Sequence, residues 1–217
     1  MKSIALSFVL ILGWVPICIA QNKPTEACRF PYDGWVTPPE QKLLIAEVAQ
    51  RATRLAFCES KKGCVASSAA PGTPILIYRE SGDWTCGYFS TSTYGGPAWI
   101  RTAELRVVPS NPQPPLKVWE GIWVGGEDRV AIRAGEKPGM LRLEGSAQWK
   151  GAGDNAHFGD MKGTATPDGN RLHFVESGPD SCIIDMTLLG HYIVASDNGL
   201  CGALNARFQG IWKRTGP

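Results

Sequence analysis

The stretch Pro109-Ser110-Asn111-Pro112-Gln113-Pro114-Pro115 divides the chain into two parts. Four prolines in seven residues remove backbone N–H donors and hold the backbone extended, so neither a strand nor a helix continues through this stretch. Such a run is typical of a linker between independently folded units. We therefore expect a linker over residues 109–117, an N-terminal unit that ends near Val108, and a C-terminal unit over residues 118–217.

The C-terminal unit consists of short runs in which apolar and polar side chains alternate, such as residues 129–133, 141–144 and 171–174. Turn residues, such as those at 167–170, separate the runs. The pattern predicts about seven or eight antiparallel strands. The expected inward positions are bulky, which predicts a filled interior and not a roomy ligand cavity. These positions are Val130, Ile132, Leu141, Leu143, Leu172, Phe174, Ile184, Met186, Leu188, Phe208 and Trp212.

Gly121-Ile122-Trp123 opens this unit, and two arginines, Arg207 and Arg214, lie near its end. The arrangement resembles the calycin superfamily, in which the tryptophan of a Gly-x-Trp motif is covered by an arginine from the closing strand. The resemblance covers residues 119–217. It implies a small antiparallel barrel with a guanidinium stacked on Trp123.

The N-terminal unit carries short apolar runs that begin near glycines, at residues 72–78, 82–88, 96–100 and 103–105. This pattern resembles the bacterial Src-homology-three-like barrel over about residues 53–108. The resemblance implies a small barrel that binds cell-wall peptides or proteins through aromatic side chains and loops at one end. The Gly-Trp-Val usual in that family is replaced here by Pro97-Ala98-Trp99-Ile100, so its ligand contacts do not transfer directly.

Residues 21–52 form an N-terminal extension that can be interpreted in two ways. Thr37-Pro38-Pro39-Glu40 is typical of a helix start, and residues 44–55 follow helical spacing. Residues 53–57 alternate instead and predict a strand that opens the barrel, so both patterns fit if the helix ends near Arg51. The expected fold is therefore all-β with one N-terminal helix, built as two small β-barrels joined by the proline-rich linker.

Aromatic side chains are the candidate ligand contacts of the N-terminal unit. Tyr88 and Tyr94 flank a run of serines and threonines, and two glycines follow Tyr94, a composition typical of recognition loops and also of mobile hairpin loops. Trp84 and Trp99 are further candidates. Large aromatics dominate small cores, so burial in the core is the competing interpretation for these two indoles.

Residues 1–20 have the pattern of a secretory signal, with Lys2 at the start, an apolar core, and small residues before a cleavage site near Ala20. An acylated Cys18 is the alternative, but the bulky Ile17 before it is unlike lipoprotein sites. We therefore expect an exported protein, periplasmic or secreted. No later apolar run approaches the ~20 residues of a membrane helix, so no membrane span is expected.

Cleavage of the leader leaves an even number of cysteines, which predicts a disulfide framework. Cys182 and Cys201 lie on opposite sides of a turn near Gly190, and we expect them to pair. The closed loop of about 20 residues would contribute roughly 3 kcal/mol of stability. The remaining cysteines allow three connectivities, among which the sequence does not choose: Cys28, Cys58, Cys64 and Cys86.

Catalytic and metal-binding patterns are weak in this sequence. Cys86 with His157 or His173 could form a cysteine hydrolase pair, but Cys86 follows Trp and Thr in an expected strand and not at a helix start. A disulfide explains this cysteine better. No two histidines have close ligand spacing, and the carboxylates lie mostly in turns, so we expect neither a metal nor a cofactor.

The chain has 22 basic and 20 acidic side chains, and removal of Lys2 with the leader reduces the net charge from +2 to +1. This balance argues against nucleic acid or an anionic membrane as partner. We expect a non-catalytic exported binding protein whose partner is a periplasmic or extracellular protein, with restraint of a secreted hydrolase as the leading case. A peptidoglycan-binding module is the alternative, and a wall-cleaving cysteine hydrolase is a distant third.

Overall fold

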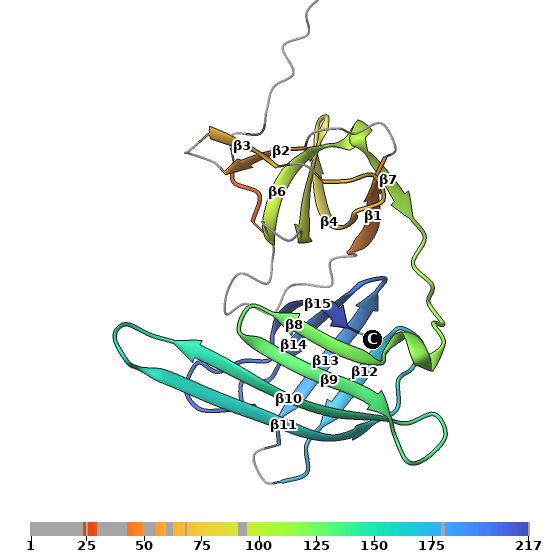
Figure 1. Ribbon diagram of the computed structural model, residues 1–217, viewed down its shortest axis with the longest axis vertical. Helices are drawn as coiled ribbons and strands as arrows, with labels where there is room; N and C mark the ends of the chain where they lie inside the picture. The colour runs from red at the N-terminus through yellow and green to blue at the C-terminus, as the bar shows by residue number, and fades with distance from the viewer. Residues whose placement is uncertain are drawn as a thin grey trace, which may run out of the picture.

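The computed structural model describes residues 24, 26–29, 43–49, 55–59, 63–67, 69–90, 95–178 and 181–216. The fold is all-β, as predicted, with two short 3₁₀ turns and antiparallel pairing between all the strands described (Figure 1). The expected secretory signal, residues 1–20, lies outside these residues. Within the described part, no helix has the length and apolar character needed to cross a membrane.

Five strands of the N-terminal part form one sheet in the order β6-β5-β4-β1-β7. Their bounds are β1 Leu44–Val48, β4 Pro74–Ser81, β5 Trp84–Ser90, β6 Gly95–Arg101 and β7 Leu105–Val108, with the 3₁₀ turn η1 at Thr102–Glu104. The hairpin of β2, Leu55–Glu59, and β3, Gly63–Ser67, contacts β6. The buried side of the sheet includes Ala46, Ile75 and Phe89.

The helix predicted from Thr37 to near Arg51 is wrong for residues 44–48, which form strand β1 between β4 and β7. Ile45, Ala46 and Val48 are buried, so the apolar residues of this segment pack as part of a sheet and not as one face of a helix. Short apolar runs fit both periodicities, and here pairing with two neighbouring strands decides between them. Residues 30–42, where the helix would begin, lie outside the described part of the chain.

Eight strands of the C-terminal part form a nearly closed barrel in the order β11-β10-β9-β8-β15-β14-β13-β12, in agreement with the predicted strand number. Strands β11 and β12 contact each other across the remaining seam. The bounds are β8 Gly121–Gly125, β9 Asp128–Ala134, β10 Leu141–Lys150, β11 Ala156–Ala165, β12 Arg171–Val175, β13 Ile183–Leu189, β14 Tyr192–Asp197 and β15 Gly210–Gly216.

Large side chains fill the barrel interior. Trp119, Trp123 and Trp212 are at most 1% exposed, and every inward position expected from the alternating pattern is buried. Gly163 shows how tight the packing is, because a Cβ at this position would lie 2.9 Å from the Phe174 ring. Interiors packed in this way leave no space for a sizeable ligand. Binding by this barrel therefore has to use its outer surface or its loops.

The proline-rich stretch joins the two parts without a strand or an α-helix, and it ends in the 3₁₀ turn η2, Leu116–Val118. The linker is attached to the barrel, because the Asn170 N–H donates to the Pro112 carbonyl at 3.0 Å. Asn111 Oδ1 accepts from the Gln113 N–H at 2.9 Å and fixes a local turn. This linker is therefore a packed segment and not a free tether.

The five-stranded sheet also packs directly on the barrel. Ile45 and Leu76 share one apolar cluster with Tyr192 and Ile211. The Tyr192 hydroxyl donates to the Pro74 carbonyl at 2.9 Å, and Tyr88 meets the Tyr192 ring edge-on at 6.1 Å. Burial raises the pKa of Tyr192 above its ordinary value, which keeps this hydroxyl protonated as a donor. The two parts therefore form a joint interface.

Tyr192→Phe tests this interface. The substitution keeps the ring but leaves the Pro74 carbonyl without its donor, so we expect the free energy of unfolding to fall by about 1–2 kcal/mol. Urea denaturation of the oxidised protein measures the change, and we expect the slope of the unfolding free energy against urea concentration to stay the same. An unchanged unfolding midpoint would contradict a stabilising role for this contact.

Candidate protein-binding surface

The aromatic residues predicted to contact a ligand do not form an exposed platform. Trp84 and Trp99 are only 6% and 1% exposed and pack around the Cys28–Cys86 disulfide. Each ring is covered by a guanidinium, with Arg101 4.5 Å from Trp84 and Arg79 5.1 Å from Trp99. Their burial supports the interpretation of these two indoles as core side chains over that of ligand contacts.

Tyr88 is half-buried and faces Tyr192 of the barrel. Its ring therefore belongs to the interface between the two parts of the molecule. Tyr94 lies outside the described residues. The recognition loop expected around these two tyrosines is thus only partly described.

The cysteines pair in a way that the sequence left open. Cys86 is bonded to Cys28, so it has no thiolate to act as a nucleophile, and the cysteine hydrolase alternative loses its catalytic group. This pairing leaves Cys58 and Cys64, which stand directly opposite each other in the β2–β3 register. Disulfides are typical of proteins that mature in an oxidising, exported environment.

The histidines considered for catalysis lie apart from Cys86. His173 Nδ1 is 2.7 Å from the Asp185 carboxylate on exposed strand positions. His157 contacts the Leu204 carbonyl and Asn155. Among the residues that the structure describes, no group of three His, Cys, Asp or Glu side chains is arranged to hold a metal ion.

Arg214 on β15 lies over the Trp123 ring on β8, with its Cζ 4.8 Å from the ring centroid. The indole N–H of Trp123 donates to the Trp119 carbonyl at 2.9 Å. Gly121 provides the close approach at this end of the barrel, since a Cβ there would lie 3.0 Å from the Gly216 carbonyl. Arg207, the other arginine considered for this position, lies elsewhere and pairs with Asp197.

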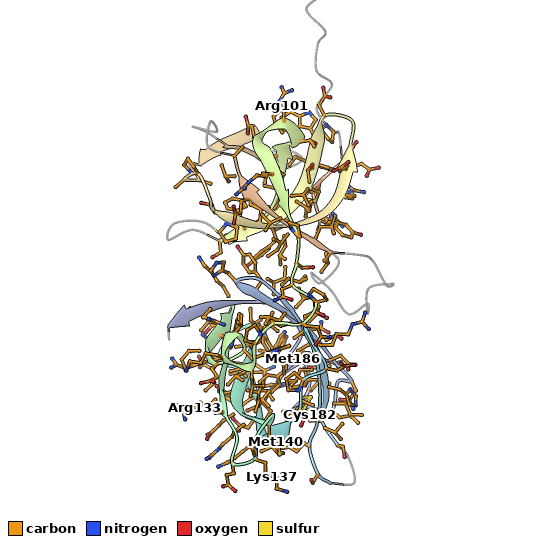
Figure 2. The ribbon with its side chains drawn as sticks, turned by 90° about the vertical axis from the view of Figure 1, so that its right-hand side faces the viewer. Arg101, Arg133, Lys137, Met140, Cys182 and Met186 are labelled. Atoms are coloured by element: carbon orange, nitrogen blue, oxygen red, sulfur yellow. A yellow bond between two sulfur atoms is a disulfide. The ribbon has the colours of Figure 1, made fainter. Side chains whose placement is uncertain are left out.

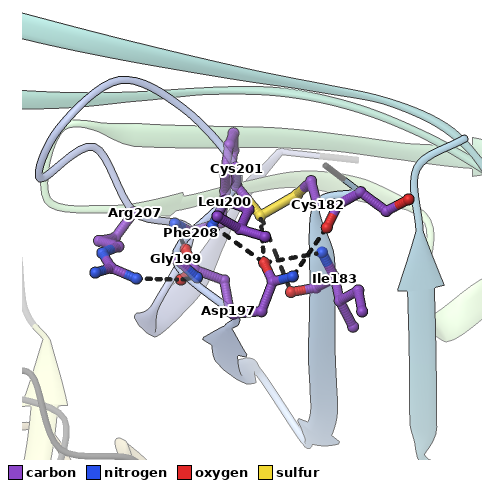
Figure 3. Close-up of a disulfide and its surroundings, with 10 residues drawn as sticks. Cys182, Ile183, Asp197, Gly199, Leu200, Cys201, Arg207 and Phe208 are labelled. Carbon is purple, nitrogen blue, oxygen red and sulfur yellow. Dashed lines mark hydrogen bonds and ion pairs between the residues drawn. A yellow bond between two sulfur atoms is a disulfide. The ribbon is translucent and has the colours of Figure 1, made fainter. Parts of the chain in front are cut away.

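The loop between β14 and β15, residues 198–209, is held by the Cys182–Cys201 disulfide that the sequence predicts (Figure 3). Asp197, at the end of β14, holds the loop with a fully buried carboxylate. This carboxylate accepts the Gly199 N–H at 2.8 Å and the Phe208 N–H at 2.5 Å, and it pairs with Arg207 at 3.3 Å. One side chain therefore fixes the loop at both ends.

Asn198 connects the same loop to the segment before β13. Its side-chain oxygen accepts the N–H groups of Ile183 and Leu200, each at 3.2 Å, and its amide donates to the Ser181 carbonyl at 2.8 Å. Gly199 has a φ of 80°, and a side chain there would run into Arg207. The turn signal Asp-Asn-Gly thus builds a compact structure that needs each of these residue types.

The loop also covers one edge of β11. The Ala203 N–H donates to the Phe158 carbonyl at 3.0 Å, and His157 contacts the Leu204 carbonyl. Covering a strand edge in this way satisfies its backbone groups and blocks unwanted pairing with other chains. The loop is therefore anchored at its disulfide, at Asp197 and along β11.

Apolar side chains project from this anchored loop. Leu204 is 74% exposed, Leu200 is 54% exposed, and Phe158 beside them on β11 is 59% exposed. These three, which we name the Leu204 surface, are half of the large exposed apolar side chains among the described residues. The sequence pattern did not single them out, although two leucines between Asn-Gly and Asn-Ala turn residues are unusual for a solvated loop.

A second carboxyl group lies close to Asp197. Asp128, at the start of β9, accepts the Gln148 N–H at 3.3 Å. Burial is the main reason that the pKa of Asp128 rises to about 7; the hydrogen bond lowers this pKa, and the Asp197 and Glu127 carboxylates raise it. This end of the barrel therefore carries a group that titrates near neutral pH.

Asp197→Ala tests the support of the loop. The buried N–H groups of Gly199 and Phe208 would lose their acceptor, so we expect a loss of about 2–4 kcal/mol in unfolding free energy. Hydrogen exchange at these two amides should accelerate. Asp185→Ala is the matched control at an exposed strand position, where we expect about 0.5 kcal/mol or less. Equal effects of the two variants would contradict the anchoring role.

Asp128→Asn tests the pH dependence. The native state binds the Asp128 proton more tightly than the unfolded chain does, whose aspartates titrate near pH ~3.9, so stability falls as pH rises from about 4 to about 7. The variant side chain cannot ionise, so above pH 7 its free energy of unfolding should exceed that of the wild type. We expect a difference of about 1–2 kcal/mol, because solvent still reaches this side chain and reduces the effect of burial. Urea denaturation across this pH range should show the two curves converging near pH ~4.

No known protein family, no curated protein and no solved structure matches this chain. The Leu204 surface is therefore identified by its own geometry: exposed apolar side chains on a loop held by a disulfide and a buried carboxylate.

Proposed function

We propose that this protein is a non-catalytic exported binding protein that engages another protein through the Leu204 surface. The observation that carries the proposal is the 74% exposure of Leu204 on a loop anchored at Cys201 and Asp197. Clustered exposed apolar side chains mark interaction sites in soluble proteins. Isolated exposed leucines would need no such explanation.

The anchoring favours binding because a loop that is ordered before it meets its partner loses little conformational entropy in the complex. The disulfide, the Asp197 carboxylate and the contacts with β11 all act on the backbone behind the leucines. The apolar side chains are therefore presented in one arrangement. This is the property expected of a recognition loop.

A protruding apolar loop fits a concave partner surface, and enzyme clefts are the common concave apolar sites of proteins. This argument supports a secreted hydrolase, restrained in the periplasm or outside the cell, as the partner class. The two disulfides support export. The Cys28–Cys86 bond also supports a non-catalytic role, because it occupies the cysteine considered as nucleophile.

We further propose that the barrel is calycin-like and that the five-stranded sheet is related to the Src-homology-three-like barrels. The stacking of Arg214 on Trp123 of the Gly-x-Trp motif supports the first assignment. The strand order of the five-stranded sheet, in which β1 lies between β4 and β7, is compatible with a small barrel in the second. Both assignments concern the scaffold, whereas the proposed function depends on the loop.

The test uses the oxidised mature protein with a panel of purified secreted hydrolases, and it measures complex formation and enzyme turnover. We expect one hydrolase to bind stoichiometrically and to lose activity. Leu204→Asp should weaken this binding by at least about tenfold, as is usual for loss of a central apolar contact. Val107→Asp is the matched control, because Val107 is 54% exposed but lies on β7 in the other part of the molecule.

Binding that Leu204→Asp leaves unchanged would overturn the proposed surface. Sedimentation with peptidoglycan sacculi, without any protein complex, would instead support the cell-wall alternative. Near-ultraviolet circular dichroism of both variants checks that they are folded. Both variants replace an exposed apolar side chain with aspartate. A difference in their binding to the hydrolase therefore reflects the position of the residue and not the type of substitution.

A further inference from the structure

The end of the barrel where β9 turns into β10 carries a groove that the proposed function does not use. This cavity of about 510 Å³ is formed by the turn and by the neighbouring ends of β10 and β11. The β9–β10 turn lies at the opposite end of these strands from the β10–β11 hairpin (Figure 1). Lys137, Arg142 and Lys162 line the groove, together with Glu136 and Met140.

The cations of this groove are only weakly neutralised. Arg142 and Lys162 share the Glu144 carboxylate at 3.8 and 4.0 Å, and all three side chains are more than half exposed. Such long, solvated pairs contribute little stability. For Lys137, the described residues provide no carboxylate within 4.0 Å. The groove therefore keeps cationic groups available to a ligand.

The strand register adds a further cation beside the groove. Arg133 on β9 stands directly opposite Arg142 on β10, and like charges in this position destabilise a sheet. Arg133 lines a second cavity of about 450 Å³ with Lys117 and Arg214. Figure 2 shows Arg133, Lys137 and Met140 toward the same end of the barrel.

The fold gathers positive side chains at one end of the barrel, although the overall composition is nearly neutral. Six cationic side chains line or border the two cavities: Lys117, Arg133, Lys137, Arg142, Lys162 and Arg214. Among the described residues, three carboxylates line these cavities or pair with these cations: Glu120, Glu136 and Glu144. The surplus of three positive charges exceeds the net charge of +2 of the whole chain. The near-neutral net charge of the chain therefore does not indicate the excess of positive charge at this end of the barrel.

We propose that this groove, which we name the β9–β10 groove, binds an acidic polypeptide segment. Arginine forms paired hydrogen bonds with carboxylates, and Arg142 is positioned for such a contact at the groove wall. Glu136 lines the groove and Glu144 pairs with Arg142, so both would repel a polyphosphate, whose charges are fixed along its backbone, whereas the flexible glutamate side chains of a peptide can turn away from them. Met140 offers an adaptable apolar contact to the body of a peptide.

The test measures fluorescence anisotropy of a labelled octaglutamate peptide with the oxidised mature protein at low ionic strength. We expect saturable binding that weakens with added salt. Arg142→Glu and Lys137→Glu should each reduce the affinity at least about tenfold, because each reverses a contacting charge. Lys150→Glu is the matched control, since Lys150 lies on the same strand with 56% of its side chain exposed, at the far end from the groove.

The proposed binding site would be overturned if octaglutamate showed no saturable binding. It would also be overturned if Lys150→Glu reduced the affinity as much as Arg142→Glu and Lys137→Glu. An oligonucleotide of equal charge that displaces the peptide more strongly than unlabelled octaglutamate would assign the groove to a polyphosphate instead and also overturn the proposal. Leu204→Asp should leave octaglutamate binding unchanged. The groove and the Leu204 surface can therefore fail independently of each other.

Discussion

The filled interior of the barrel is the constraint on which the rest of the structure depends. Trp119, Trp123 and Trp212 occupy the volume that a ligand would need, and Arg214 packs over Trp123 at one end. Close packing of this kind contributes most of the stability of a small β-domain. It also moves recognition to the outside, because an interior without space can only position the loops and strand ends around it.

The two candidate surfaces use this rigid support in different ways. The Leu204 surface presents apolar groups on a loop that a disulfide and a buried carboxylate hold in place. The β9–β10 groove presents solvated cations on strand ends that the barrel pairing fixes. Apolar contact supplies affinity, whereas charge mainly supplies selectivity and rapid encounter. A protein partner with an acidic segment could use both surfaces.

The five-stranded sheet is joined to the barrel by more than its linker. Tyr192 is shared between them, since its ring packs against Tyr88 and its hydroxyl bonds to Pro74. Lys213 adds a hydrogen bond to the Ser90 carbonyl at 2.8 Å. Interfaces built from a few apolar side chains and isolated hydrogen bonds are modest in strength. These contacts nevertheless hold the five-stranded sheet against the barrel in one arrangement.

The strands of the barrel, its buried face and the Cys182–Cys201 pair can be predicted from the sequence, because alternation along a strand and the spacing about a turn are local properties. It did not determine that residues 44–48 form a strand, since a short apolar run suits both periodicities. The tertiary structure is needed to show that Trp84 and Trp99 are buried, that Leu204 is exposed, and that cations gather at one end of the barrel. Burial and charge clustering depend on contacts between residues distant in sequence, which no local pattern records.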